Sequence, residues 1–341
     1  MRVAGKNPSG KELERIKGST QFDGKIFKNF SETPMMSEDA SYFKMLKFFF
    51  KKNPDKVPQK VLPFIETNLK ETSSSKPTIN WFGHSSYLLR VEGKNFLIDP
   101  VFSGNASPVS FMVSAFEGAN TYGVAEMPVI DYLILTHDHY DHLDYKTVME
   151  LKPKVKAVYC SLGVGSHLRY WGYDSSMVHE MDWWQTEEIG NDFTLTAAPA
   201  RHFSGRGIKR CLTLWSSFLL QTKNYRIYLG GDSGYDSHFK EIGNRFENID
   251  LAILECGQYN TMWPLIHMMP EETVQAAVDL KAKQLLPVHW GKFALAMHSW
   301  NDPIKRATIK ARELDVNLQM PKIGESLVVG ETFHKSEWWE I

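Results

Sequence analysis

The chain of 341 residues contains only three cysteines, and they lie far apart in the sequence. No two of them form a CxxC pair, and an odd number cannot complete a set of disulfides, so no disulfide framework is indicated. We expect reduced thiols, most of them in the core, as is typical of cytoplasmic proteins. These residues are Cys160, Cys211 and Cys256.

Long apolar runs are missing as well. No stretch approaches the roughly 18 consecutive apolar residues of a membrane-spanning helix. The opening residues, MRVAGKNPSG, also lack the apolar stretch of a secretory signal peptide. The sequence therefore predicts a cytoplasmic protein without a transmembrane helix.

Neither sign of charge dominates the chain. The formal net charge is -1 and the pI is about 6.9, whereas a nucleic-acid-binding domain is usually basic. A GxSxG motif is also absent, so a serine-hydrolase mechanism has no support. What the chain does have is 43% apolar residues, which is enough for the core of a large domain.

The sequence changes character near residue 75. Residues 1–75 are rich in lysine and read as an N-terminal arm, which ends in the polar linker KETSSSKP. Residues 76–341 begin with short β-like runs and continue with alternating strand and helix patterns. Three segments are predicted helices, namely 145–153, 238–246 and 269–283. This order predicts one α/β domain in which two sheets are faced by helices.

One segment of the arm, residues 41–52, is amphipathic. Its aromatic and leucine side chains recur at helical spacing, and lysines flank them. Two interpretations are open: a helix that packs on the main domain, or a basic helix that docks on a lipid surface.

The sequence THDHYDHLD, at residues 136–144, follows the apolar run Tyr132–Leu135. A strand followed by HxHxDH directs several imidazoles and a carboxylate from one tight loop, and these groups are ligands of Zn²⁺. Burying so many polar groups without partners would be costly, and a metal ion would satisfy them. The motif therefore predicts a metal site.

Three further candidate ligands follow other apolar runs: His202 after LTAAPA, Asp232 after RIYLGG, and His289 after QLLPV. Each one alone is weak evidence. Together with the first motif they give seven ligands, which is enough for two zinc ions that share a bridging hydroxide and a bridging carboxylate.

This set of motifs resembles the metallo-β-lactamase superfamily over about residues 77–320. The resemblance implies an αβ/βα sandwich of two mixed β-sheets flanked by helices, with two Zn²⁺ ions at one edge. It implies that His137, His139 and His202 hold one metal. It assigns the other metal to Asp141, His142 and His289, and the bridging position to Asp232.

A narrower resemblance is to the branch of phospholipases D that hydrolyse N-acylphosphatidylethanolamine. It rests on INWFGHSSYLLRVEGKNFLIDPVFS, LTHDHYDHLD, PARHFSGRG, GGDSGYD and PVHWGKFAL. It implies cleavage of a phosphodiester by a metal-bridging hydroxide, which releases phosphatidic acid and an N-acylethanolamine. Asp99 and His267 match positions needed for activity there, beside the metal-binding Asp141 and Asp232. Lys292 departs from the pattern, because a small polar residue is expected after Gly291.

Other residues near the motifs have more open interpretations. His84 is a candidate for a place beneath the metals, and Asp144 for orienting a loop, whereas Asp138 is expected to be solvated or to cap a loop. An anion such as phosphate could be faced by Arg201, Arg206 and Lys292. A set of tryptophans is either core or the rim of an acyl-chain site, namely Trp183, Trp184, Trp263, Trp290 and Trp300.

The sequence leaves three functions open: a phosphodiesterase of lipids, a metal-dependent hydrolase of a soluble ester, lactone or phosphate, and a metal-stabilised binding module. The complete set of seven ligands argues against the last. The expected partner is a phospholipid or another small-molecule substrate, with peripheral membrane association and no nucleic acid. Whether the chain forms a homodimer stays open.

Overall fold

The structure, a computed structural model, describes residues 2–38, 40, 53–71, 74–109, 111–190, 192–331, 333 and 336–341. The predicted amphipathic segment 41–52 lies outside the described residues. None of the helices in the described ranges is long and apolar enough to cross a membrane.

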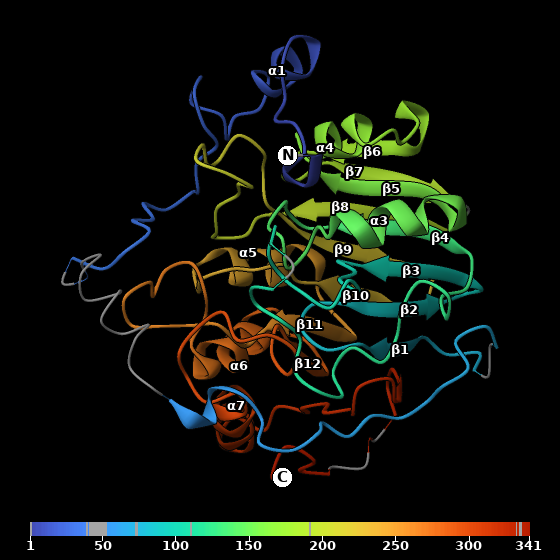
Figure 1. Cartoon of the computed structure of the whole chain (residues 1–341), viewed down its shortest axis with the longest axis vertical. Coiled ribbons are helices and arrows are strands. Elements are labelled where there is room, and N and C mark those ends of the chain that lie inside the picture. The colour runs from blue at the N-terminus through green and yellow to red at the C-terminus, as the bar shows by residue number, and fades with distance from the viewer. Residues whose placement is uncertain are drawn as a thin grey trace.

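One layer of the fold is a seven-stranded sheet with the order β13-β1-β2-β3-β4-β5-β6 (Figure 1). Neighbours are antiparallel from β13 to β3 and parallel from β3 to β6. The strands are β1 (Thr78–Trp81), β2 (Tyr87–Val91), β3 (Lys94–Ile98), β4 (Ile130–Leu135), β5 (Val155–Ser161), β6 (Val178–Met181) and β13 (Ser326–Val328).

The second layer is a six-stranded sheet with the order β12-β11-β10-β9-β8-β7. It is antiparallel from β7 to β10 and parallel from β10 to β12. Its strands are β7 (Thr186–Gly190), β8 (Phe193–Ala198), β9 (Ser217–Gln221), β10 (Arg226–Leu229), β11 (Leu251–Glu255) and β12 (Leu285–Val288).

Helices cover the outer faces of both sheets (Figure 1). The first sheet carries α3 (Tyr145–Leu151) and α4 (Gly165–Tyr170), and the second carries α5 (His238–Phe246), α6 (Pro270–Asp279) and α7 (Asp302–Glu313). All three predicted helices are present, and Pro270 begins α6 as expected. The shorter elements are η1 (Arg2–Ala4), α1 (Lys11–Ile16), η2 (Pro54–Lys56), η3 (Lys152–Lys154) and η4 (Ser175–Met177). The predicted fold class, two mixed sheets flanked by helices, is confirmed.

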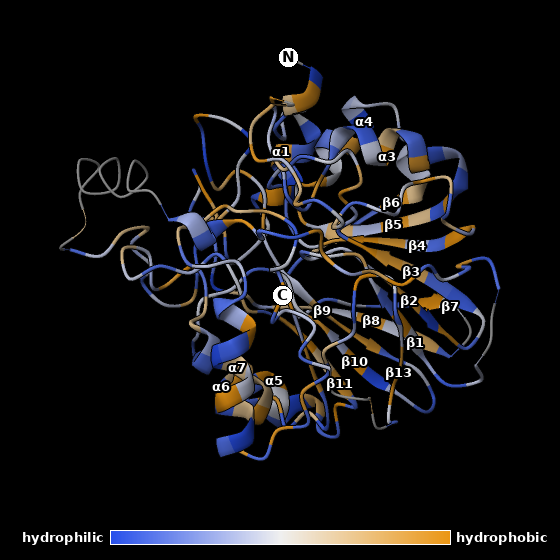
Figure 2. Ribbon diagram, turned by 60° about the horizontal axis from the view of Figure 1, so that its bottom comes forward, coloured by the Kyte–Doolittle hydropathy of each residue, from blue (hydrophilic) through white to orange (hydrophobic). Residues whose placement is uncertain are grey.

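Alternating side chains hold the layers together. In β2, Tyr87 and Leu89 belong to the core between the sheets, while Leu88 belongs to the core under α3 and α4. This division follows from the two-residue period of a strand. Because both faces of each sheet are covered, the central strands are largely apolar, and Figure 2 shows orange along them. The edge strand β7 is polar and mostly exposed.

The parallel strands deliver their following loops to one edge of the sandwich. Asp99 follows β3 and His137 follows β4, while Asp232 follows β10 and His289 follows β12. Asp99, His289 and also His84, after β1, have φ values of 41°, 67° and 53°. Positive φ is uncommon outside glycine and is concentrated at functional sites.

The N-terminal arm packs against the main body. Ile16 and Phe27 are 0% and 1% exposed, and they share a core cluster with Leu162, Leu214 and Trp215. Residues 2–38 are therefore built onto the loops between β5 and β9 rather than standing apart from them.

We predict that Phe27→Ala lowers the free energy of unfolding of the whole protein by about 3 to 5 kcal/mol, since it removes a buried aromatic ring. Phe30→Ala is the matched control, because Phe30 is 54% exposed and loses at most about 1.5 kcal/mol of ring contact. Denaturant titration measures both. Equal losses in the two variants would show that the arm is not part of the core.

Candidate metal centre

The HxHxDH loop is held from below by Asp99. Its Oδ1 accepts from the Thr136 N–H at 2.9 Å, and its Oδ2 accepts from the Thr136 hydroxyl at 2.5 Å and from His142 Nδ1 at 2.7 Å. Asp99 is fully buried. The carboxylate therefore fixes both the start of the loop and the orientation of the His142 ring, with Nε2 directed away from it.

All seven predicted ligands come together at this edge, and they fall into two adjoining groups. The ligand atoms within each group lie within 4.8 Å of one another. One group consists of His137, His139, His202 and Asp232, and the other of His84, Asp141, His142 and His289. The division matches the one that the family resemblance implies, and His84 joins the second group, where its Nε2 lies 2.9 Å from Asp141 Oδ2.

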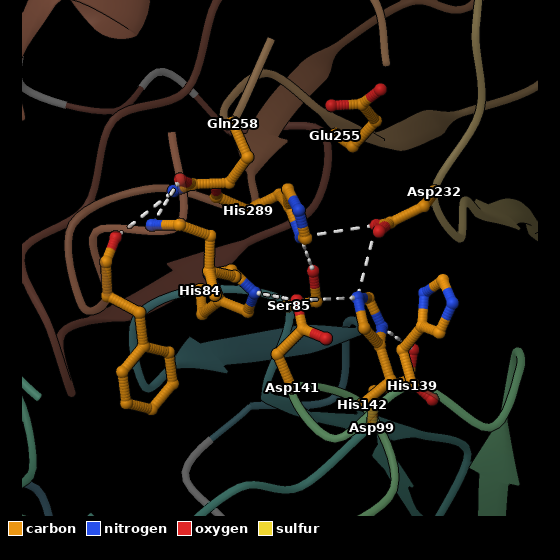
Figure 3. Close-up of polar contacts among 12 residues, drawn as sticks. His84, Ser85, Asp99, His139, Asp141, His142, Asp232, Glu255, Gln258 and His289 are labelled. Atoms are coloured by element: carbon orange, nitrogen blue, oxygen red, sulfur yellow. Dashed lines mark hydrogen bonds and ion pairs between the residues drawn. The ribbon is translucent and has the colours of Figure 1, made fainter. Parts of the chain in front are cut away.

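Asp232 lies between the two groups, and Figure 3 shows its contacts with His142 and His289 of the second group. Its Oδ1 is 3.1 Å from His142 Nε2 and 3.1 Å from His289 Nδ1. Its Oδ2 is 3.7 Å from His202 Nε2 and 3.9 Å from His137 Nε2. Each carboxylate oxygen therefore faces a different group, which is the arrangement that a bridging ligand requires.

The polar atoms of this cluster fit a cation. His142 Nε2 and Asp232 Oδ1 are buried and lack a well-formed hydrogen bond, a costly state for polar groups. Burial lowers the pKa of His137, His202 and His289 well below the ordinary value of histidine, so their imidazoles are neutral and available as ligands. The cluster could hold divalent metal.

The pKa values of His142 and Asp232, at the middle of the cluster, are shifted by their charged neighbours. Burial alone would lower the pKa of His142, but Asp232, Asp141 and Asp99 outweigh it and hold that pKa well above its usual value. Burial would likewise raise the pKa of Asp232, yet His142 and His289 hold it well below the ordinary range. Carboxylates at this position are therefore ionised and need positive charge beside them.

Hydrogen bonds from the ring nitrogens fix other ligands. His202 Nδ1 donates to the Ile266 carbonyl at 2.8 Å, which leaves the lone pair on Nε2 for the cluster. Ser85 Oγ lies 2.9 Å from His289 Nδ1. The bond to Ile266 sets the tautomer and the direction of the His202 ring, as is usual for a metal-binding imidazole. Ser85 contacts the same His289 nitrogen that faces Asp232.

His267 lies beside the cluster, as its sequence position suggested. Its ring centroid is 5.0 Å from that of His202 and 5.3 Å from that of His289. Sequence reasoning missed its partner Glu255, the last residue of β11, whose Oε1 is 3.5 Å from His267 Nδ1. Burial raises the pKa of Glu255 to about 7. The available signal was an acidic residue ending the apolar run IDLAIL.

Asp138 and Asp144, which lie among the candidate ligands in the sequence, both have structural roles. Asp144 caps α3 by accepting from the Lys146 N–H, as a loop-orienting role requires. The expectation for Asp138 was wrong in one part, because its side chain is buried rather than solvated. It accepts from His167 Nε2, the Gly205 N–H and the Thr213 hydroxyl. These bonds tie the metal-binding loop to the loop after β8.

The expectation that three basic side chains face an anion is also wrong. Arg206 is 5% exposed, and its guanidinium donates to the carbonyls of Asp138, Leu143 and Val3. The Arg201 guanidinium is likewise held by groups of the protein, mainly in the arm. Lys292 is fully buried and donates from Nζ to the carbonyls of Phe82 and Val101. Each cation braces loops around the site.

The tryptophans divide between the two interpretations. Trp183, Trp290 and Trp300 are buried, and Trp290 packs with Trp81 and Trp338 in the core. Only Trp184 and Trp263 of the predicted set are partly exposed. The core interpretation therefore holds for most of them.

The arm also reaches the cluster. The Asn29 side chain donates from Nδ2 to the His202 carbonyl at 2.8 Å and accepts at Oδ1 from the His202 N–H at 3.1 Å. Its Oδ1 also accepts from Trp215 Nε1 at 2.9 Å. One amide thus pairs with both main-chain groups of a candidate ligand.

Sequence comparison agrees with this geometry. The beta-lactamase superfamily domain matches residues 94–290, which is more than half of the chain. The chain belongs to the metallo-β-lactamase superfamily. An uncharacterized protein of Mycobacterium tuberculosis is 38% identical over 83% of this chain and 77% of its own length.

Two relatives of this chain are named for the same enzymatic activity. N-acyl-phosphatidylethanolamine-hydrolyzing phospholipase D 1 of Caenorhabditis elegans is 31% identical over 63% of this chain and 64% of its own length. The mitochondrial enzyme of that name from Saccharomyces cerevisiae is 31% identical over 72% of this chain and 55% of its own. The resemblance to this branch is thereby confirmed, and the chain is a metal-dependent hydrolase of the superfamily.

Solved structures share the fold. Igni18, a metallo hydrolase of Ignicoccus hospitalis, superposes with a TM-score of 0.56 at 16% identity and covers 75% of this chain and 99% of its own. The isothiocyanate hydrolase from Delia radicum gut bacteria gives a TM-score of 0.58 at 17% identity, with coverages of 74% and 98%. At these identities the likeness establishes the architecture alone.

We predict that Asn29→Ala weakens the binding of metal at the His202 side by about 10- to 100-fold, because the main chain of a ligand loses both partners. Competition with a chromophoric chelator measures the affinity. Asn53→Ala is the control, since Asn53 also ties the N-terminal region to the body, through the Met297 carbonyl, but touches no ligand. If both variants bind metal equally well, Asn29 does not position His202.

The two groups predict two metal equivalents per chain, and the unpartnered polar atoms predict that metal stabilises the fold. Elemental analysis after zinc loading and gel filtration measures the first, and the melting temperature with and without chelator measures the second. A maximum of one equivalent, or an unchanged melting temperature, would count against a dinuclear site.

Proposed function

We propose that this protein is a zinc-dependent phosphodiesterase of the phospholipase D type that acts on N-acylphosphatidylethanolamine-like lipids. The observation that carries the proposal is Asp232, whose two oxygens each face a separate group of ligands. A site that binds two cations side by side suits the charge of a phosphodiester in its transition state. The two relatives named for this activity support the choice of substrate class.

Two Zn²⁺ ions bound by the seven ligands would supply Lewis acidity and lower the pKa of a coordinated water toward neutrality. The chain contributes orientation. Asp99 directs His142, the Ile266 carbonyl directs His202, and Ser85 and His84 contact ligands of the second group. Groups that are already oriented need not move when charge develops in the transition state, so they can stabilise it without a cost of reorganisation.

His267 is placed to handle the leaving group. In the proposed reaction, water adds to phosphorus and the bond from phosphorus to the ethanolamine oxygen breaks. That oxygen needs a proton, and His267 Nε2 can give it, because Nδ1 faces Glu255. Burial would lower the pKa of His267, but Glu255 outweighs it and raises that pKa above its ordinary value. The imidazolium form is thus favoured beside a developing alkoxide.

Two exposed loops support peripheral membrane association. Ile208 is fully exposed and is followed by Lys209 and Arg210, while Phe111 is 83% exposed in the loop after β3. An apolar side chain next to basic ones, as at Ile208, is typical of surfaces that bind anionic lipid, and Phe111 adds an exposed aromatic ring. A lipid substrate would be reached at such a surface.

The direct test is an assay of the zinc-loaded protein with N-acylphosphatidylethanolamines and, in parallel, with soluble esters, lactones and phosphomonoesters. Release of phosphatidic acid and N-acylethanolamine, with heavy oxygen from labelled water appearing in the phosphate, is expected. Turnover confined to a soluble substrate would replace the proposal with a hydrolase of small soluble molecules.

Asp232→Asn should lower kcat on the lipid substrate by on the order of a hundredfold or more, the effect of removing one group that stabilises transition-state charge. A neutral amide bridges two cations poorly, while the fold, followed by circular dichroism, should persist. Asp236→Asn, on the same loop but outside the cluster, is the control. Near-normal turnover of the Asp232 variant would remove Asp232 from the bridging position.

A further inference from the structure

A cavity of about 370 Å³ lies between the N-terminal arm and the main body, next to the metal centre. The arm contributes residues 26–35 except Phe30 to its wall. The body contributes His202, Phe203, Cys211, Trp215 and Ile266. This volume falls within the range of about 300 to 1,000 Å³ that is usual for small-molecule sites.

The cavity adjoins the candidate metal ligands. His202 lines it directly, and Ile266 precedes His267 in the chain. The Phe203 ring also lines it and lies 4.5 Å from the His139 ring, between centroids. A molecule that fills this space therefore touches the side of one candidate metal ligand and a ring in contact with another.

The wall of the cavity is predominantly apolar. Its accessible apolar surface comes from Ile26, Pro34, Met35 and Phe203. Phe27, Trp215 and Ile266 back this surface and are 1%, 1% and 7% exposed. Several polar lining groups have partners within the protein. Lys28 Nζ, for example, lies 3.3 Å from Asp23 Oδ2, and the Thr33 hydroxyl donates to the Ser31 carbonyl.

The wall is also preformed rather than assembled on binding. Asn29 bonds the main chain of His202, and the Arg201 guanidinium donates to the Glu32 carbonyl at 2.8 Å and to the Thr33 hydroxyl at 3.0 Å. A cavity whose walls are fixed before binding loses less entropy on taking a flexible chain.

We propose that this cavity binds one hydrocarbon chain of the substrate and so makes the arm a specificity element of the enzyme. The inference rests on the proposed function, since it requires a lipid phosphodiester at the metal centre. The chain enters along Phe203 and lies between Met35 and Ile266, with its polar end toward His202. Each CH₂ that is buried there is expected to lower KM by up to about fourfold, from about 0.8 kcal/mol per CH₂.

The first experiment varies chain length. Substrates with progressively longer N-acyl chains, and separately with longer glycerol-ester chains, are assayed with zinc-loaded enzyme as dispersed monomers. The wild-type KM should fall as one of these two chains grows, which identifies the occupant. Met35→Trp fills the cavity, so that this dependence should flatten. Met36→Trp, next in the chain but not in the lining, should retain the wild-type dependence.

The second experiment needs no turnover. Cys211 lines the cavity, whereas the other two cysteines of the sequence, Cys160 and Cys256, are buried. The rate at which iodoacetamide alkylates Cys211 is measured by mass spectrometry with n-alkylphosphocholines, octyl to hexadecyl, below their micelle concentrations. Protection that rises with chain length in the wild type and is lost in Met35→Trp is expected.

The results of these experiments distinguish a failure of the proposed binding cavity from a failure of the proposed reaction. Chain-dependent protection without lipid hydrolysis would overturn the proposed reaction but leave the binding site in place. Lipid hydrolysis with a KM that is independent of both chains, and no protection of Cys211, would overturn the cavity while leaving the reaction intact. An unchanged length dependence in Met35→Trp, with the variant folded, would likewise overturn it.

Discussion

The structure depends on one electrostatic constraint: carboxylates and imidazoles are buried together at the edge of the sandwich, with too few hydrogen bonds among them. Asp232 is 3% exposed and its Oδ1 lacks a well-formed hydrogen bond, and an uncompensated buried charge costs several kcal/mol. Divalent cations would offset this cost, because they attract the carboxylates and bind the neutral histidines. The burial that makes the metal-free site unfavourable is therefore expected to give the site a high affinity for metal.

The fold meets this constraint by bringing distant loops to one edge. Parallel pairing of β3 with β4, and of β10 with β11 and β12, places the ends of these strands side by side. Buried polar side chains then brace the loops against one another, as Arg206 and Lys292 do through main-chain carbonyls. The arm adds a further brace at His202 through Asn29. The metal centre is thus supported by segments that are far apart in the sequence.

Much of this arrangement could be predicted from the sequence, because ligands at the ends of apolar runs carry a local signal. The fold class, three helices and the candidate ligands themselves followed from such patterns, whereas the grouping of Asp232 with two sets of histidines was implied by the family resemblance. Contacts that depend on tertiary packing could not be predicted. The burial of Asp138 depends on His167 and on a distant loop, and Glu255 is marked only by its strand position. The packing of the arm on the body could not be predicted either. Residues 17–38 have little regular structure, so their sequence shows no helical or strand periodicity.

Two cations are expected to bind side by side with Asp232 between them. Anomalous diffraction at the zinc absorption edge, from crystals of the zinc-loaded protein, tests this arrangement most directly. The account predicts two peaks about 3.5 to 4 Å apart, one beside His137, His139 and His202 and the other beside Asp141, His142 and His289. A single peak, or a second peak away from Asp232, would contradict it.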